Sequence, residues 1–441
     1  MRTLGNYEVT MGGSRNVEHT VLRDGSGNGY LKGVRLDDVF EGTEEPAYVL
    51  TNEKRGIKHE DSNGEQVVRP GSAYNAVLAV TDERVLLLVG GNEEKSGQNR
   101  RVSLPYTEIR SVESKSGMLK SRLTLTARTS DRYTFWLGGR EDYGHVEEHI
   151  ETAISYWVAL DRRLEKAREH LTEVEDTLDD GDPMMARTAI DRTEELLGEA
   201  EQVATNFRDG DHAMHRRVAQ LESRLSLARI RTHWTQARHL AGAAESARTD
   251  GDYLEAYEAY SRSLSEYERA TDLSDDVEYQ AADDLPNEMA GVEKAVTEVG
   301  AAPLREATEA CEAATGAEAR TAVDRWTTAL DTCHEALTLV LRREDVFDGD
   351  PDSLRFQVEW AAQKLVEAHR TVADEARDRG QAAREAGDAA TAVEAYDRAR
   401  DHYESARQVA AEFRSCDPGR FERALDSLPE NVDGKTADPR T

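Results

Sequence analysis

The sequence predicts an α+β protein: a β-rich head followed by an all-α region of long antiparallel helical hairpins. Short apolar runs separated by turn residues fill residues 71–139, which indicates strands. After residue 160, Ala, Glu and Arg dominate, and turns that combine Gly or Pro with Asp recur. The charge shifts at the same place: residues 1–160 hold 20 Lys and Arg against 24 Asp and Glu, so −4 of the net −31 lies there and −27 beyond it. We therefore place a domain boundary near residue 160.

The composition predicts a soluble protein of an unusual kind. The chain has 10 Lys, 46 Arg and 87 acidic residues among 441. This balance resembles that of proteins from salt-in halophiles, notably haloarchaea, because molar salt shortens the Debye length to about 3 Å and screens carboxylate repulsion. A mesophilic chain is the alternative. Residues 1–19 lack an apolar export segment and no run of 18 apolar residues occurs, so we expect a cytoplasmic protein.

Three cysteines are too few and too widely separated to suggest chemistry of their own. Cys311, Cys333 and Cys416 match neither a metal-ligand pattern nor a disulfide framework. We expect reduced thiols, no metal and no cofactor.

Residues 1–44 precede the strand pattern and are expected to form an extension, part strand and part loop. Their Gly-rich stretch "DGSGNG" (24–29) lacks the Gly-x-Gly-x-x-Gly spacing, so we interpret it as a turn in preference to a phosphate-binding loop.

The head, residues 45–160, shows strand patterns in order from residue 71. Asp82 and Glu83 separate two apolar runs and so predict a hairpin. In 121–128, Leu123, Leu125 and Ala127 share one face of a strand. The expected strands are 75–81, 84–91, 100–115, 121–128 and 132–139. After them, Val146, Ile150, Ile154 and Trp157 recur at helical spacing and predict a helix that covers the strands.

Three motifs in this region occur in a recognisable order: "TDERVLLLV" (81–89), "LPYTEIRSVE" (104–113) and "GMLKSRLTL" (117–125). Together with the terminal helix they resemble the bacterial-type pleckstrin-homology-like (PH-like) domain, over about residues 45–160. The resemblance implies a β-barrel or sandwich with a capping helix. It also implies a non-catalytic module that binds lipid headgroups, peptides or other proteins.

The head also concentrates positive charge. Residues 100–140 contain nine Lys and Arg against three acids. Lys115, Lys120 and Arg122 surround one turn and could converge on one anion. Alternatively, they pair with neighbouring carboxylates or face solvent. High salt weakens diffuse membrane attraction, so we favour a protein or intramolecular acidic partner, with membrane recruitment as the alternative.

Residues 161–416 are expected to form helices of about 25–36 residues. The predicted breaks are 179–183, 208–211, 249–252, 283–288, 314–316, 348–352, 385–388 and 416–419. Residues 417–441 should hold a short helix and a disordered tail.

A sequence motif recurs at these breaks: Gly, then Ala about five residues later, then a large residue about nine residues after the Gly. The four occurrences are Gly181–Ala186–Ile190, Gly251–Ala256–Tyr260, Gly316–Ala322–Trp326 and Gly387–Ala392–Tyr396. The stretch 379–399 resembles the turn of a tetratricopeptide repeat (TPR). The period of roughly 70 residues is about twice that of the family, and its early Trp and Leu and its closing Pro are missing. TPR-like hairpins with long arms, or a spectrin-like bundle, are both consistent with it.

Four arginines follow a heptad spacing within residues 215–238: Arg217, Arg224, Arg231 and Arg238. They flank an apolar seam, and we expect ion pairs with an acidic neighbouring helix. A docking face for an acidic partner is the alternative. The overall negative charge argues against nucleic acid.

Catalytic motifs are scarce. "HVEEH" (145–149) matches an inverted zinc-protease pattern through His145 and His149, but no third ligand is evident, so a zinc hydrolase is a minor alternative. We therefore expect a non-enzymatic scaffold, whose PH-like head and helical platform are separate modules. One continuous core across residue 160 would count against this separation.

Overall fold

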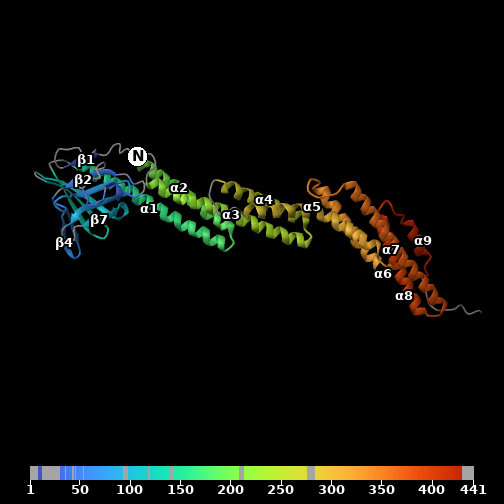
Figure 1. Cartoon of the computed structure of the whole chain (residues 1–441). Coiled ribbons are helices and arrows are strands. Elements are labelled where there is room, and N and C mark those ends of the chain that lie inside the picture. Colours follow the sequence, from blue (N-terminus) through green and yellow to red (C-terminus); the bar gives the residue numbers. More distant parts are fainter. Residues whose placement is uncertain are drawn as a thin grey trace, which may run out of the picture. The chain divides into compact units, whose positions relative to one another are not determined.

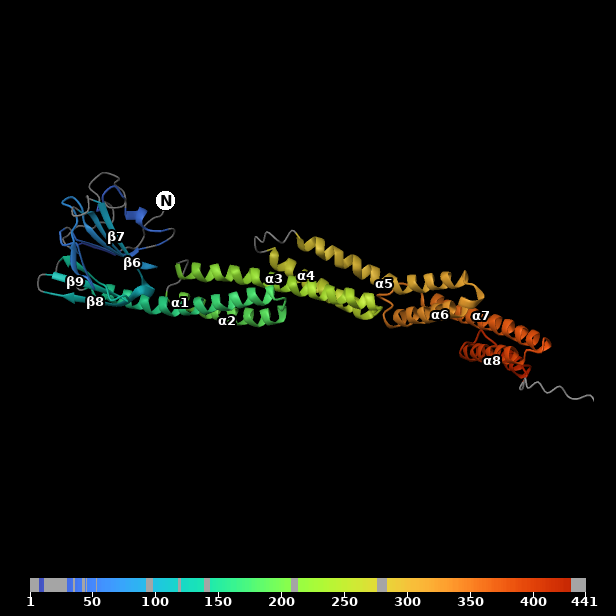
Figure 2. The ribbon, with the colours of Figure 1, turned by 90° about the horizontal axis from the view of Figure 1, so that it is seen from below.

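The computed structural model divides the chain into two compact units, Met1–Thr232 with Leu273–Tyr279, and His233–Asp272 with Gln280–Thr441. The strands belong to the N-terminal part of the first unit, and helices follow (Figure 1, Figure 2). The structure describes residues 8–11, 30–34, 36–41, 44, 46–52, 54–92, 98–117, 120–138, 143–207, 213–275 and 284–429. The stretch at 24–29 and the expected C-terminal tail lie outside the described residues.

The head consists of two five-stranded sheets, with strand orders β1-β2-β5-β6-β7 and β4-β3-β10-β9-β8. All neighbouring pairs are antiparallel except β1 and β2, which are parallel. The strands are β1 (Glu8–Met11), β2 (Pro46–Asn52), β3 (Ile57–Asp61), β4 (Gly64–Val68), β5 (Ala76–Thr81), β6 (Arg84–Asn92), β7 (Gln98–Pro105), β8 (Ile109–Ser116), β9 (Lys120–Ala127) and β10 (Arg132–Gly138).

The predicted hairpin around Asp82 and Glu83 is confirmed as β5–β6. All side chains of β5 are buried because both faces of the first sheet are covered. One face contributes to the main core, and the other packs against Leu31, Leu36 and Val39. The described part of residues 30–44 is therefore part of the head's packing, and not an extension from it.

The strands of the head differ from the expectation in two places. β2, β3 and β4 precede residue 71; β3 and β4 are mostly polar or exposed, which hides their alternation. The expected strand 100–115 is two strands, β7 and β8, in different sheets. They are separated by a 3-10 turn (Tyr106–Glu108), where Tyr106 is buried and donates its hydroxyl to the Thr81 carbonyl at 2.6 Å.

Helix α1 (Gly144–Asp179) both caps the head and begins the helical region. Val146, Ile150 and Trp157 are buried, as expected, whereas Ile154 is only partly buried and Ala153 takes its place in the core. The helix continues without a break through Leu160 and Leu164. The buried core thus continues across the expected boundary near residue 160: one buried cluster extends from Leu50 to Ala228.

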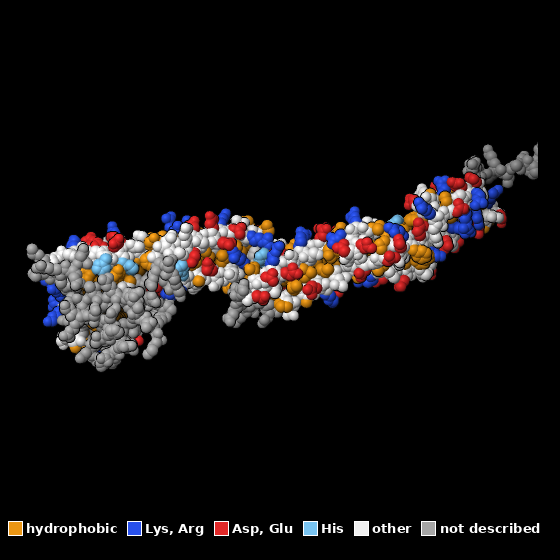
Figure 3. Space-filling model, turned by 90° about the horizontal axis from the view of Figure 1, so that it is seen from above, with side chains coloured by type: hydrophobic (Ala, Val, Ile, Leu, Met, Phe, Trp, Pro, Cys, Tyr) orange, Lys and Arg blue, Asp and Glu red, His pale blue; other side chains and the backbone are white. Residues whose placement is uncertain are grey.

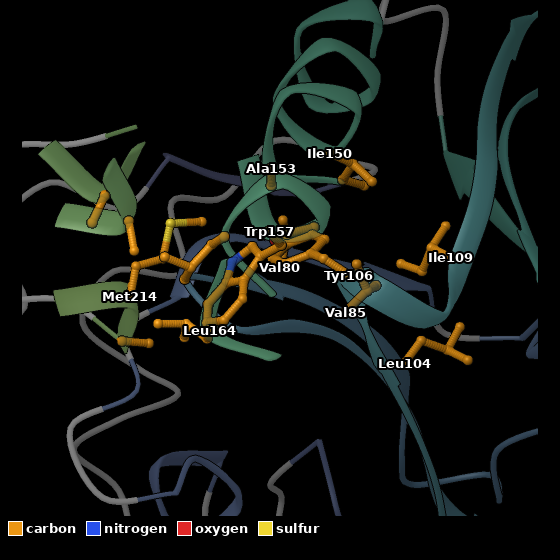
Figure 4. Close-up of a cluster of buried hydrophobic side chains, with 14 of the residues drawn as sticks. Val80, Val85, Leu104, Tyr106, Ile109, Ile150, Ala153, Trp157, Leu164 and Met214 are labelled. Carbon is orange, nitrogen blue, oxygen red and sulfur yellow. The ribbon is translucent and has the colours of Figure 1, made fainter. Parts of the chain in front are cut away.

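Figure 4 shows where this cluster joins sheet and helices: Trp157 of α1 lies between Val80 and Val85 of the hairpin and Met214 of α3. Polar contacts reinforce the junction. The Trp157 indole donates to the Asp82 carbonyl at 2.9 Å, and the Asp82 carboxylate accepts from the Ala213 amide at 3.2 Å. The "TDER" turn thus connects the head to α1 and α3 within the first unit.

The remaining described helices are α2 (Pro183–Phe207), α3 (Ala213–Asp250), α4 (Tyr253–Ser274), α5 (Leu285–Thr315), α6 (Ala319–Arg342), α7 (Pro351–Glu385), α8 (Ala389–Glu412) and α9 (Gly419–Asp426). They begin at or close to the predicted breaks, but α4 and α6 end six or more residues before theirs, at Ser274 and Arg342. None of the described helices combines the length and apolar character needed to cross a bilayer.

Three of the four copies of the Gly–Ala–large motif form the same turn. Gly181, Gly251 and Gly387 have φ of 78°, 86° and 75°, the left-handed conformation that glycine adopts without strain. In each, the amide of the following Asp donates to the carbonyl five residues back, as in a Schellman motif. The side chains of Asp182 and Asp388 then cap the next helix.

The turn at the fourth copy of the motif, at Gly316, has a different backbone conformation. Gly316 has φ of −93°, and α6 begins three residues later, at Ala319, with Glu318 as its N-cap. The extra residue in this turn removes the need for a left-handed glycine, so the repeat is regular at three turns and not at four.

Candidate functional site

The basic residues expected near the turn at 114–122 lie on one face of the second sheet. Lys115 of β8 is directly opposite Arg122 of β9, and Arg122 is opposite Trp136 of β10. Lys120 precedes Arg122 by two residues on the same strand and therefore points to the same side. We call Lys115, Lys120, Arg122 and Trp136 the basic row. Directly opposite residues have Cβ atoms about 4.5–5.5 Å apart, close enough to contact one ligand together.

The basic row lies on the outer face of this sheet. Its three cations are exposed and Trp136 is half-buried, whereas the alternate positions Leu123 and Phe135 are fully buried. Alternation along β9 and β10 thus separates a core face from a face that ligands can reach.

The charges of the basic row are poorly neutralised. Lys115 Nζ lies 3.6 Å from the Glu113 carboxylate, and the side chains are 61% and 63% exposed, so this pair stabilises little. Within the described residues, neither Lys120 nor Arg122 has a carboxylate within 4 Å.

In contrast to the basic row, another cation on the same face of the sheet, Lys58, is paired with carboxylates. Lys58 of β3 lies 2.8 Å from Glu65 and also contacts Glu60. Its hydrogen bonds to Glu60 and Glu65 raise the pKa of Lys58 above its ordinary value. The outer face therefore has a neutralised end at β3–β4 and a positively charged end at β8–β9.

Trp136 was not singled out by the sequence analysis. The signal was available: Tyr133, Phe135 and Leu137 occupy one face of the strand, which places Trp136 on the opposite one. Trp and Arg, here the neighbours Trp136 and Arg122, are enriched where proteins bind other proteins.

The four heptad arginines are all paired with carboxylates, as the first interpretation predicted. Three pair with α1 in the first unit: Arg217 with Asp161 at 3.9 Å, Arg224 with Glu175 at 2.9 Å and Arg231 with Asp179 at 3.1 Å. Arg217 also lies over the Trp157 ring, 4.8 Å from its centroid. These side chains join α3 to α1, so their use as a docking face would require breaking existing ion pairs.

Arg238, in the second unit, contacts a carboxylate with several donors. Glu288 of α5 accepts from Arg238 Nε at 2.9 Å, from the Trp234 indole at 2.7 Å and from the Tyr267 hydroxyl at 2.8 Å. The hydrogen bonds from Arg238 lower the pKa of Glu288 to about 2, against the opposing effect of partial burial. This cluster fastens α3, α4 and α5 together.

His145 and His149 share a helix face, as the zinc pattern requires, but both rings pack on Tyr48. The ring centroids are 5.6 Å and 5.2 Å apart, in edge-on geometry. Among the described residues there is no group of three His, Cys, Asp or Glu side chains that could hold a metal ion. The geometry of these two histidines fits aromatic packing of α1 on β2.

An open groove of about 400 Å³ lies between α5 and α6. It is lined by Ala310, Ala313, Thr321, Asp324, Arg325 and Thr328. Its walls are small or exposed side chains without a buried polar group, so it lacks the convergent donors and acceptors of a small-molecule site.

The basic row is therefore the site whose geometry and charge best fit an external ligand. Comparisons with protein-family models, with curated proteins and with solved structures found no match to this chain.

Proposed function

We propose that the protein is a non-enzymatic scaffold whose PH-like head binds an acidic protein segment along the basic row. The observation that carries this proposal is the cross-strand series Lys115–Arg122–Trp136, with Lys120 beside it, on the outer face of β8–β10. TPR-like hairpins, built on the repeated Gly–Asp turn, would present further surface to protein partners.

An acidic protein segment suits this surface better than a diffuse anionic membrane. Two exposed cations lack a carboxylate partner among the described residues, which favours an anionic ligand. Trp136 adds apolar area, and burial of apolar area is not weakened by salt as charge attraction is. A peptide carrying carboxylates and an apolar side chain would use both features.

The continuous core changes how such a scaffold would work. The hypothesis of two separate modules loses its basis, because the head and the α1–α3 helices of the first unit share one core across residue 160. We propose instead that a ligand on the basic row is held in a fixed position relative to α1 and α2.

The test is binding of a fluorescent acidic peptide, poly-Glu with an interspersed Leu, to the full chain at molar salt. Replacement of both Arg122 and Trp136 by Ala should weaken binding at least about tenfold, since central aromatic and Arg contacts dominate interface energies. The matched control replaces the exposed head cations Arg110 and Arg128 by Ala and should leave affinity nearly unchanged.

Three outcomes would overturn the proposal. Equal losses in both variants would mean that binding follows net charge and not this site. Flotation with phosphatidylglycerol vesicles at molar salt, abolished by R122A/W136A while the peptide fails to bind, would favour membrane recruitment. A pull-down from the native host, at native salt, that recovers no protein partner would contradict the scaffold itself.

A further inference from the structure

Two of the three cysteines, 22 positions apart in the chain, meet in the second unit. Cys311 of α5 and Cys333 of α6 have their sulfur atoms 3.6 Å apart. Cys311 is 9% exposed and Cys333 is fully buried. The third, Cys416, lies after α8 beside Ser415 and is half-buried.

The helix seam around the two thiols is made of small residues. One turn before and about one turn after each cysteine lie buried alanines: Ala307 and Ala314 on α5, and Ala329 and Ala336 on α6. Small side chains let two helix backbones approach closely, and this brings the cysteines into contact. The sulfur atoms must close by only about 1.5 Å to reach the length of a disulfide bond.

We propose that Cys311 and Cys333 form a redox-active dithiol, which low-molecular-weight disulfides convert to an intramolecular disulfide that fastens α5 to α6. Because the two sulfur atoms are already in contact, the crosslink requires only a short closing movement. It closes a loop that contains the α5–α6 turn, and it acts on the helical platform independently of the basic row.

The order of attack follows from the hydrogen bond between the thiols. Either sulfur can donate in this contact, and Cys311 is the more exposed of the two. When Cys311 is a thiolate, the Cys333 thiol donates to it; this hydrogen bond lowers the pKa of Cys311 and raises that of Cys333. Cys311 is therefore the first thiolate and attacks one sulfur of the external disulfide R–S–S–R. The S–S bond breaks, R–S⁻ leaves, and a mixed disulfide forms on Cys311.

Cys333 completes the exchange. Its thiol loses a proton to solvent, attacks the Cys311 sulfur and expels the second R–S⁻. Two protein thiols are oxidised, and one external disulfide is reduced to two thiols, so the electrons balance.

The experiment exposes the full chain, carrying Cys416→Ser, to a small aliphatic disulfide such as hydroxyethyl disulfide. Free thiols are then alkylated and the digest is analysed by mass spectrometry. We expect a Cys311–Cys333 linked peptide that has lost two hydrogen atoms, and a melting temperature raised by about 5 °C or more. Reductant should reverse both changes.

Single variants Cys311→Ser and Cys333→Ser should show neither the linked peptide nor the temperature shift. The linked-peptide measurement on the Cys416→Ser chain does not depend on these variants folding. Full alkylation of both cysteines after the treatment would overturn the proposal, and so would a stable mixed disulfide on Cys311 alone. A linked chain that melts at a lower temperature than the reduced one would contradict a crosslink compatible with the native packing.

Discussion

Glu44 in the β-rich head and Glu288 in the second unit make the same kind of contact in different surroundings. Each accepts Nε of an arginine at 2.9 Å and a hydroxyl group: Glu44 from Arg84 and Thr81, Glu288 from Arg238 and Tyr267. The Glu44 side chain is fully buried, whereas that of Glu288 is 30% exposed.

This difference in burial changes how the pKa of each carboxyl group is set. Burial, the largest single influence on Glu44, raises its pKa, but the hydrogen bonds from Arg84, the Glu41 amide and Thr81 together outweigh it and leave the pKa below its ordinary value. For Glu288 the bonds from Arg238 are the largest influence, and the pKa falls to about 2. The head thus keeps a carboxylate charge at a fully buried position. The second unit keeps one at a partly exposed position beside Trp234 and Tyr267, where the cost of desolvation is lower.

The largest expected effect concerns the continuous core of the first unit. Trp157→Ala should lower the free energy of unfolding by about 3–5 kcal/mol, because it removes a large buried ring and its bond to Asp82. Denaturant titration followed by circular dichroism measures this.

The matched control is Trp136→Ala on the outer face, which should cost below about 1 kcal/mol because the ring is half-exposed. Equal losses in the two variants would show that Trp157 does not join the sheets to the helices.

The second prediction concerns the partly exposed carboxylate of Glu288. Glu288→Gln should lower the stability of the second unit by about 2 kcal/mol at pH 7, because three donors lose a charged acceptor. The pKa of Glu288 is lower in the folded chain, so its contribution is complete above about pH 4.5. It is lost as the pH falls toward about 2.

The difference in unfolding free energy between Glu288→Gln and the unaltered chain should therefore shrink between pH 5 and pH 3, as measured by denaturant titration. The exposed residue Glu298, whose one ion pair within the described part of the chain is with Lys294 at 3.5 Å, provides the control Glu298→Gln. A pH-independent difference for Glu288→Gln would refute the charged hydrogen bonds as its cause.

The smallest expected effect distinguishes the regular turns from the irregular one. Gly387→Ala should cost about 1 kcal/mol because its φ of 75° strains any residue with a Cβ atom. Gly316→Ala, at φ −93° and with open space around a Cβ, should be neutral or stabilising by up to about 1 kcal/mol. Thermal unfolding measures both, and the same sign for both would contradict the difference between the turns.

Much of the helical region could be predicted because its signals are local. Gly, Pro and Asp end and cap helices through their own backbone and side-chain chemistry, so the helix ends follow from the breaks at Gly181, Gly251 and Gly387. The heptad arginines likewise indicated a neighbouring acidic helix, although their individual partners did not follow from spacing.

The boundary near residue 160 could not be located from composition. Charge and amino-acid usage change there, but the apolar stripe Val146–Ile150–Trp157 continues through Leu160 and Leu164 on one helix face. Composition along the chain mainly reflects the exposed, charged residues. A domain boundary depends instead on which buried side chains share a core.

By itself the sequence determined the helix-ending turns at Gly181, Gly251 and Gly387, the hairpin at Asp82, and the positive charge of residues 100–140. Each of these depends on residues close together in the chain. Only the tertiary structure decided that Trp136 joins the cations in a row, that Cys311 touches Cys333, and that head and helices share a core. Such contacts join residues tens of positions apart, and they depend on strand register and on how closely small side chains let helices approach.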